Sequence, residues 1–135
     1  MLIRPYDRVE DEASLFDMIL QEGGGWSEYL GPSDRHRYAT ALASSTTYVA
    51  REDAVVCGYV RCRGDDGLGV YVHDLLVRRS HRGRHLGRAL LDRVRADFGG
   101  QPVYVLSDVD AYYEGLGYPR AGSVFRVVDG TGGGG

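Results

Sequence analysis

The sequence predicts a mixed α/β fold of the α+β kind. Segments whose apolar residues recur at helical spacing alternate with runs of β-branched and aromatic residues, and glycine clusters separate them. Two β runs follow each other across a short turn, which favours antiparallel pairing, whereas a later run is short and continuously apolar, as is typical of a buried strand. We expect a single domain over residues 1–129 and a flexible glycine-rich tail at 130–135.

The first third of the chain predicts one short strand and two helices. Residues 2–4 form the strand. Apolar residues at helical spacing predict a helix over 10–21, and the triple glycine at 23–25 ends it. A serine or aspartate cap after Pro32 predicts a second helix that runs to about Ser44.

The rest of the chain alternates strands with helices. The runs rich in valine, threonine and tyrosine read as strands, and an amphipathic pattern between them reads as a helix. In chain order we expect strands at 46–51, 54–63 and 69–77, a helix at 86–98, a strand at 103–106, a helix from Asp108 or Asp110 to 116, and a strand at 123–128.

Composition excludes several classes of function. The net charge is -3 and arginines crowd into the stretch 78–95 while the N-terminal part of the chain is acidic, so we expect no nucleic-acid partner. The absence of lysine excludes Schiff-base chemistry. No metal-ligand spacing, long apolar run or secretory segment is present, so we expect no metal, no membrane partner and a cytoplasmic location. Cys57 and Cys62 fit small apolar residues in a reducing compartment.

The segment 77–91 runs from an apolar strand through an arginine- and glycine-rich turn into a helix. Unpaired amides at a helix N-terminus, the helix dipole and nearby guanidinium groups all attract phosphate. Gly83 and Gly87 allow close approach of the main chain. The segment therefore predicts a phosphorylated ligand. ATP or NAD is disfavoured, because neither a Walker A lysine nor a Gly-x-Gly-x-x-Gly motif is present.

Two motifs in residues 68–128 resemble the Gcn5-related N-acetyltransferases (GNAT). The turn Arg82-Gly83-Arg84-His85-Leu86-Gly87 resembles the family's acetyl-CoA signature, and Tyr112-Tyr113-Glu114-Gly115-Leu116-Gly117-Tyr118 resembles its C-terminal motif. His85 stands where the family most often has glycine. The position can still bind a diphosphate if His85 keeps helical backbone angles, since its amide is then available.

The resemblance implies a fold, an acyl donor and a set of donor-binding residues. The fold is a largely antiparallel central sheet, flanked by helices on both faces and bulged in the strand at 69–77. The donor is acetyl-CoA, bound by a single acyl-CoA N-acyltransferase domain. Its implied binding residues are Leu75, Leu76, Val77, Arg82, Gly83, Arg84, His85, Leu86, Gly87, Arg88 and Tyr113.

Three residues are candidates for catalysis. Tyr113 matches the tyrosine that donates a proton to the coenzyme sulfur in many GNAT members, although a core aromatic is the alternative reading. Asp74 could remove the amine proton or attract a cationic acceptor, and the alternative is a surface carboxylate paired with arginine. His73 is the rival base. We rank Asp74 ahead of His73.

The acceptor is inferred from the region before Asp34, which covers the acceptor side in this family. Aromatic and acidic side chains there suit a cationic amine, through Trp26, Glu28, Tyr29 and, on the strand, Asp74. We expect acetyl transfer to a small-molecule amine by direct attack in a ternary complex. A protein N-terminus or lysine as acceptor, and an acetyl-CoA sensor without turnover, are the alternatives. The strand at 123–128 offers an edge for a homodimer.

Overall fold

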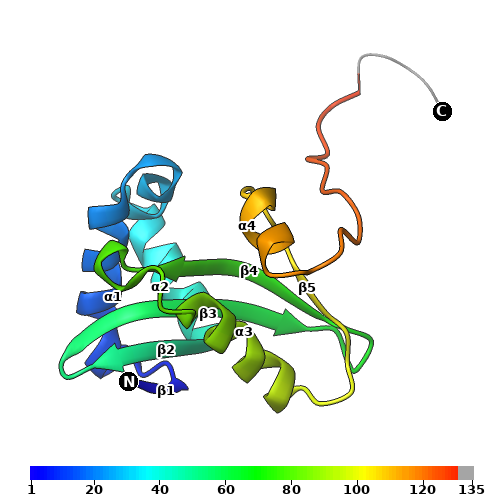
Figure 1. The fold of residues 1–135 in the computed structure, drawn as a ribbon. Helices are drawn as coiled ribbons and strands as arrows, with labels where there is room; N and C mark the ends of the chain where they lie inside the picture. Colours follow the sequence, from blue (N-terminus) through cyan, green and yellow to red (C-terminus); the bar gives the residue numbers. More distant parts are fainter. Residues whose placement is uncertain (131–135) are drawn as a thin grey trace. The chain divides into compact units, whose positions relative to one another are not determined.

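The computed structural model describes residues 1–130. Its elements are, in order, β1 (Leu2–Pro5), α1 (Arg8–Glu22), the 3₁₀ helix η1 (Gly24–Leu30), α2 (Asp34–Ser44), β2 (Thr46–Glu52), β3 (Val55–Gly64), β4 (Val70–Val77), the 3₁₀ helix η2 (Arg79–His81), α3 (Leu86–Asp97), β5 (Val103–Val105) and α4 (Asp110–Gly115) (Figure 1). One compact unit spans Met1–Val105 and a second begins at Leu106. The single domain over 1–129 stays a prediction, and the tail expected at 130–135 lies, apart from Gly130, outside the described residues.

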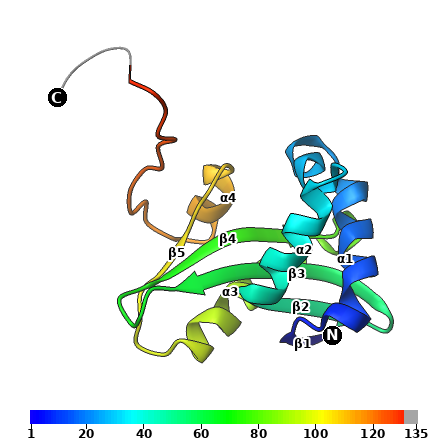
Figure 2. The same ribbon diagram turned by 180° about the vertical axis from the view of Figure 1, so that it is seen from behind.

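The first unit is built on a five-stranded sheet in the order β1-β2-β3-β4-β5. Neighbouring strands are antiparallel except β4 and β5, which are parallel. Helices α1 and α2 cover one face of the sheet and α3 covers the other, as the two opposite views show (Figures 1 and 2). The expected fold class, a largely antiparallel sheet with helices on both faces, is therefore confirmed.

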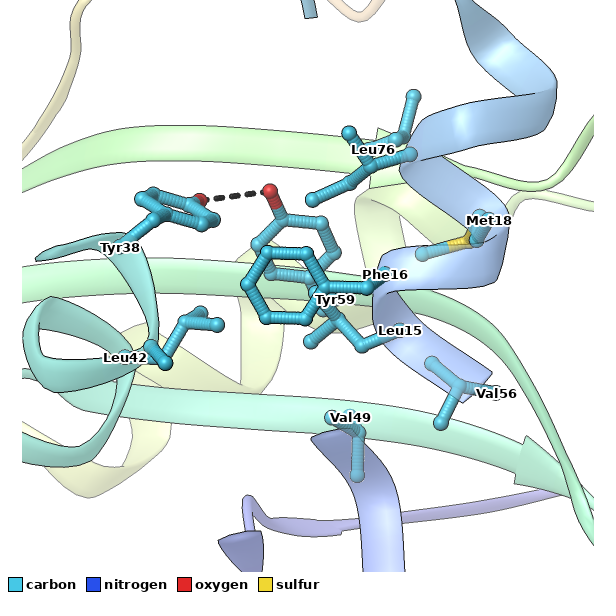
Figure 3. Packing of buried hydrophobic residues seen from close by; sticks show 11 residues of the cluster. Leu15, Phe16, Met18, Tyr38, Leu42, Val49, Val56, Tyr59 and Leu76 are labelled. Carbon is cyan, nitrogen blue, oxygen red and sulfur yellow. Dashed lines mark hydrogen bonds between the residues drawn. The ribbon is translucent and has the colours of Figure 1, made fainter. Parts of the chain in front are cut away.

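The larger core lies between the sheet and helices α1 and α2. Apolar residues of α1 at helical spacing, among them Leu15, Phe16 and Ile19, are at most 1% exposed and pack against Val49 of β2 and Tyr59 of β3 (Figure 3). Full burial of one such side chain stabilises the fold by about 1.5–3 kcal/mol relative to an exposed one. Gly23 caps the end of α1 with a positive φ, so the triple glycine ends this helix as expected.

The second core lies under α3. Its buried residues Leu86, Leu90 and Val94 face the other side of the sheet. A Cβ placed on Gly58 would lie 3.1 Å from the Leu76 carbonyl oxygen and 3.3 Å from Leu90. Glycine at this position of β3 therefore allows α3 to approach the sheet closely.

Asp11 joins the start of α1 to the sheet from a fully buried position. Arg4 donates to both of its carboxylate oxygens, at 2.7 and 2.9 Å, and Arg51 donates to Oδ1. The backbone amide of Asp7 donates to Oδ2 at 2.8 Å. These contacts connect α1, β1 and β2 through one buried charge.

A β-bulge in β4 decides which face Asp74 occupies. Arg61 of β3 pairs with Asp74, but the next residue, Cys62, pairs with Val72, so His73 is the extra residue. Paired residues share a face and consecutive residues alternate, so Val72 and Asp74 lie on opposite faces. The bulge turns Asp74 to the face of the sheet that α1 and α2 cover. The bulge expected in this strand is therefore confirmed.

One predicted element is wrong. Residues 123–128 form no strand, and Val124, Phe125, Val127 and Val128 are 71–95% exposed. Their β propensity is high, but a strand needs a hydrogen-bonding neighbour, and none is present within residues 1–130. The homodimer therefore loses the edge on which it was inferred and stays a prediction. Every other predicted helix and strand is present, with ends within two residues of those expected.

Two further observations concern cysteines and membranes. Cys57 and Cys62 are buried free thiols, as expected. Burial raises the pKa of both, that of Cys62 to about 11, so both stay protonated at neutral pH. No helix in residues 1–130 combines the length and the hydropathy needed to cross a bilayer.

Candidate functional site

Two residues in the loop between β4 and α3 have positive φ angles. Gly83 has φ +81°, and His85, the residue before α3, has φ +59° and ψ +22°. The condition of helical angles at His85 is therefore not met, because its backbone is left-handed. A side chain in this region costs about 1 kcal/mol relative to glycine, which gives a physical reason for the glycine that is usual there in the resembling family.

The first amides of α3 are free. Within residues 1–130, the N–H groups of His85, Leu86, Gly87 and Arg88 donate no hydrogen bond. The amide of Arg82 differs, since it donates to the Arg79 carbonyl oxygen at 3.3 Å. Free amides at the start of a twelve-residue helix form an anion-binding position, reinforced by the helix dipole.

The arginines of this region fall into two groups. Arg79 and Arg82 both bind Glu22 at the end of α1, at 3.4 and 2.5 Å. Arg84 and Arg88 are exposed and form no ion pair with any residue of the described chain. Of the predicted phosphate-binding arginines, Arg84 and Arg88 are thus available to an anion, and Arg82 is engaged with α1.

Strand β4 has an open edge next to this loop. β5 pairs with β4 only from Val70 to Val72, and no described strand lies beside the remainder of β4 on that side. Three of the predicted acetyl-CoA-binding residues, Leu75, Leu76 and Val77, lie on this open stretch. Their main-chain groups on the β5 side therefore lack a strand partner.

Asp74 is the centre of a buried hydrogen-bond network on the opposite face from α3. The side chain of Asp74 is 6% exposed. Its Oδ2 accepts from Arg61 Nε at 2.7 Å and from the Tyr38 hydroxyl at 2.8 Å, while its Oδ1 accepts from the Tyr29 hydroxyl at 3.0 Å. The expected arginine partner is therefore present, but the pair is buried and not on the surface.

Tyrosines extend this network into the core. The hydroxyls of Tyr38 and Tyr59 are 2.7 Å apart (Figure 3). Because Tyr38 uses its proton for Asp74, Tyr59 donates to Tyr38. Burial, followed by the charge of Asp74, raises the pKa of Tyr29 and Tyr38, and burial also raises that of Tyr59. All three are neutral donors at physiological pH.

The predicted acceptor residues of η1 differ in their surroundings. The Tyr29 ring stacks on Tyr38 with centroids 3.9 Å apart, and Trp26 packs edge-on against Tyr29 and Tyr59. Trp26, Tyr29 and Asp74 are therefore brought together. Glu28 is exposed and has no hydrogen-bond partner in the described part of the chain.

His73 occupies the bulge beside Asp74 and is half-buried. Burial, followed by the positive charge of Arg61, lowers its pKa below the usual 6.5. The imidazole is consequently neutral at pH 7 and able to accept a proton.

Tyr113 lies in the second unit, on α4. Its ring contacts Tyr112 edge-on, with centroids 5.0 Å apart. Burial raises its pKa to about 12, so its hydroxyl keeps its proton at neutral pH. That is a requirement for a proton donor.

Sequence reasoning missed three members of the Asp74 network, namely Arg61, Tyr38 and Tyr59. The predicted hairpin of β3 and β4 places Arg61 opposite this part of β4. With a regular register from the turn onward, however, its partner would be His73 and not Asp74. Within residues 1–130, no group of three or more histidine, cysteine, aspartate or glutamate side chains could hold a metal ion.

Comparisons with solved structures agree with this fold. A Deinococcus radiodurans protein assigned to the acetyltransferases is 26% identical, with a TM-score of 0.69 over 93% of this chain and 87% of that one. A ribosomal-protein-alanine N-acetyltransferase from Brucella melitensis is 20% identical, with a TM-score of 0.70 over 97% and 100%. An aminoglycoside 6'-N-acetyltransferase complexed with coenzyme A is 19% identical, with a TM-score of 0.65 over 87% and 73%.

Sequence comparison identifies the family. No curated protein sequence matches the chain significantly. The family model for the acetyltransferase (GNAT) domain matches residues 43–120, which is more than half of the chain and includes both motifs. The chain therefore belongs to the GNAT acetyltransferases.

Proposed function

We propose that this protein transfers an acetyl group from acetyl-CoA to a primary amine of a small molecule, by direct attack in a ternary complex. The observation that carries the proposal is the construction of β4. Its open edge leads to the free amides of α3, and its bulge turns Asp74 to the helix side of the sheet. One strand thus carries a surface for the donor and a carboxylate for a cationic acceptor.

Donor binding is proposed for the loop before α3 and the open edge of β4. The amides of His85, Leu86, Gly87 and Arg88 bind the diphosphate, with Gly83 allowing close approach and Arg84 supplying charge. Main-chain groups at 75–77 bind the pantetheine arm. The resemblance to a structure that contains coenzyme A supports this placement.

Acceptor binding is proposed for Trp26, Glu28, Tyr29 and Asp74. Aromatic rings and carboxylates suit an ammonium group through cation–π and Coulomb attraction. Proteins with a similar fold include aminoglycoside 6'-N-acetyltransferases and a ribosomal-protein-alanine N-acetyltransferase. A small-molecule amine is our first choice of acceptor, and a protein amine is the second.

Transfer requires that the amine lose a proton and that the departing thiolate gain one. Acetyl-CoA supplies the thioester carbon that the amine attacks. We assign proton donation to Tyr113, whose raised pKa keeps its proton in place. His73 and Asp74 remain the two candidate bases. The donors already bound to Asp74 favour an acceptor-binding role for it, whereas His73 is neutral and accepts no such donor.

Release of free thiol from acetyl-CoA tests this function directly. We expect release with at least one member of a panel containing an aminoglycoside, a polyamine and a peptide with an N-terminal alanine. Binding of acetyl-CoA without release for any amine would favour a sensor module. Tyr113→Phe is expected to slow release while the Kd for acetyl-CoA changes little, and Tyr112→Phe on the same helix is the matched control.

The free thiols extend the proposal to the compartment. Since Cys57 and Cys62 are both unpaired, we propose a reducing environment such as the cytoplasm.

A further inference from the structure

Helix η1 is joined to the sheet by a single polar contact. Trp26, Tyr29 and Leu30 pack against the core through apolar surface. In residues 1–130, the bond from the Tyr29 hydroxyl to Asp74 Oδ1 is the only hydrogen bond that a side chain of η1 makes. Besides this apolar packing, the Tyr29 hydroxyl is therefore the one side-chain hydrogen bond that links η1 to β4 within the described residues.

We propose that Tyr29 is a positioning residue for the acceptor amine. Its bond to Asp74 fixes η1 over the bulge of β4 and orients the Asp74 carboxylate. The acceptor ammonium then binds the same Oδ1 beside the Tyr29 hydroxyl. This inference rests on the proposed function, because it concerns the acceptor of that reaction.

The unequal use of the two carboxylate oxygens selects Oδ1 as the acceptor's partner. Oδ2 already accepts from Arg61 and Tyr38, which leaves it no room for a third strong donor. Oδ1 accepts only from Tyr29 and keeps a lone pair. Tyr29 enters from the short helix η1, while Arg61 and Tyr38 enter from regular elements. The fixed side of the carboxylate is therefore Oδ2, and the adjustable side is Oδ1.

Aromatic packing makes the position of Tyr29 consequential for a cation. Its ring stacks on Tyr38 at 3.9 Å between centroids, and Trp26 contacts its edge at 6.0 Å between centroids. Loss of the hydroxyl bond frees the Tyr29 ring to shift relative to Tyr38. The aromatic surface for the ammonium would then lose its fixed distance from Oδ1.

Tyr29→Phe tests this role, with Tyr6→Phe as its matched control. Tyr6 also packs against this core, but its buried hydroxyl has no hydrogen-bond partner in the described residues. Trp26 is the only tryptophan of the chain and lies in η1, so its emission reports the position of that helix. In Tyr29→Phe we expect red-shifted emission and stronger quenching by acrylamide, measured without substrates. Tyr6→Phe should leave both unchanged.

Kinetics with an amine that supports thiol release complete the test. A hydrogen bond to a charged group corresponds to roughly tenfold or more in an equilibrium constant, so we expect the acceptor KM to rise about tenfold. The kcat and the Kd for acetyl-CoA should change little. Unchanged Trp26 emission, or a fall in kcat at constant KM, would overturn the proposal. If no amine supports release, the proposed function fails and the role of Tyr29 toward an acceptor fails with it; if release occurs but the Tyr29→Phe results are those that overturn the role, only the role fails.

Discussion

Two buried aspartates of this molecule have different partners. Asp11 binds two arginines and a backbone amide, all from the regular framework of β1, β2 and the start of α1. Asp74 binds one arginine and two neutral phenols, one of them from the short helix η1. The difference teaches that a saturated carboxylate serves the fold, whereas one with a replaceable neutral partner is suited to a ligand.

The largest expected effect is on the Asp11 side of this comparison. Asp11→Asn leaves Arg4 and Arg51 close together without their shared counter-charge. Breaking a buried pair in this way costs about 3–5 kcal/mol of unfolding free energy. Chemical denaturation measures the loss, and Asp17→Asn, which changes a carboxylate 54% exposed, is the control. A loss below about 1 kcal/mol would remove the distinction between the two aspartates.

Asp74→Asn is expected to destabilise the fold less than Asp11→Asn does and to weaken binding of the acceptor. Only one arginine, Arg61, loses its counter-charge, compared with two at Asp11, so we expect a stability cost at the lower end of the range for a buried pair, about 3 kcal/mol. The acceptor loses the charge that attracts it, so the KM for a cationic amine should rise. A loss of stability alone would not raise this KM. Steady-state kinetics and denaturation of the same sample measure both. An Asp74→Asn protein as unstable as Asp11→Asn, with unchanged KM, would make Asp74 a purely structural residue.

The sequence predicted most of the helices and strands around Asp11 and Asp74. Helical spacing in α1 and the triple glycine after it were sufficient for that helix, and the two motifs located the loop before α3. A bulge in this strand was expected from the family resemblance, but its position at His73 and its consequence for register were not. Moving the partner of Arg61 from His73 to Asp74 is a change of one residue that no local pattern records.

The remaining errors have physical causes of the same kind. Tyr38 reads as an apolar position of α2, and only tertiary packing brings its hydroxyl to Asp74. At His85 the family motif predicts glycine, and the left-handed backbone shows the conformation that glycine would serve. At 123–128 propensity predicts a strand, but no described strand pairs with it. Local pattern thus placed elements, while pairing and side-chain networks required the three-dimensional structure.

Two tyrosines sharpen the comparison within the Asp74 network. Tyr38→Phe removes a donor to Asp74 and leaves the buried Tyr59 hydroxyl without its acceptor, which costs about 1–3 kcal/mol. Tyr59→Phe removes only the end of the chain, and we expect about 1 kcal/mol. Thermal denaturation of both variants and of the double variant measures the coupling. Equal single effects that add in the double variant would contradict a connected network.

The smallest expected effect is a pH dependence confined to the Asp74 side. Burial lowers the pKa of His73 in the folded protein, so the unfolded chain binds its proton more readily. The stabilising contribution of neutral His73 is therefore complete above pH 6.5 and is lost as the pH falls through 6.5 toward the lowered pKa. His73→Gln should lose less stability than the parent chain between pH 7 and pH 5. Asp11 has no histidine among its hydrogen-bond partners, so the difference between parent and His73→Gln should persist unchanged in an Arg51→Gln background. A pH profile that changes with Arg51 instead of His73 would place the titrating group at the other aspartate.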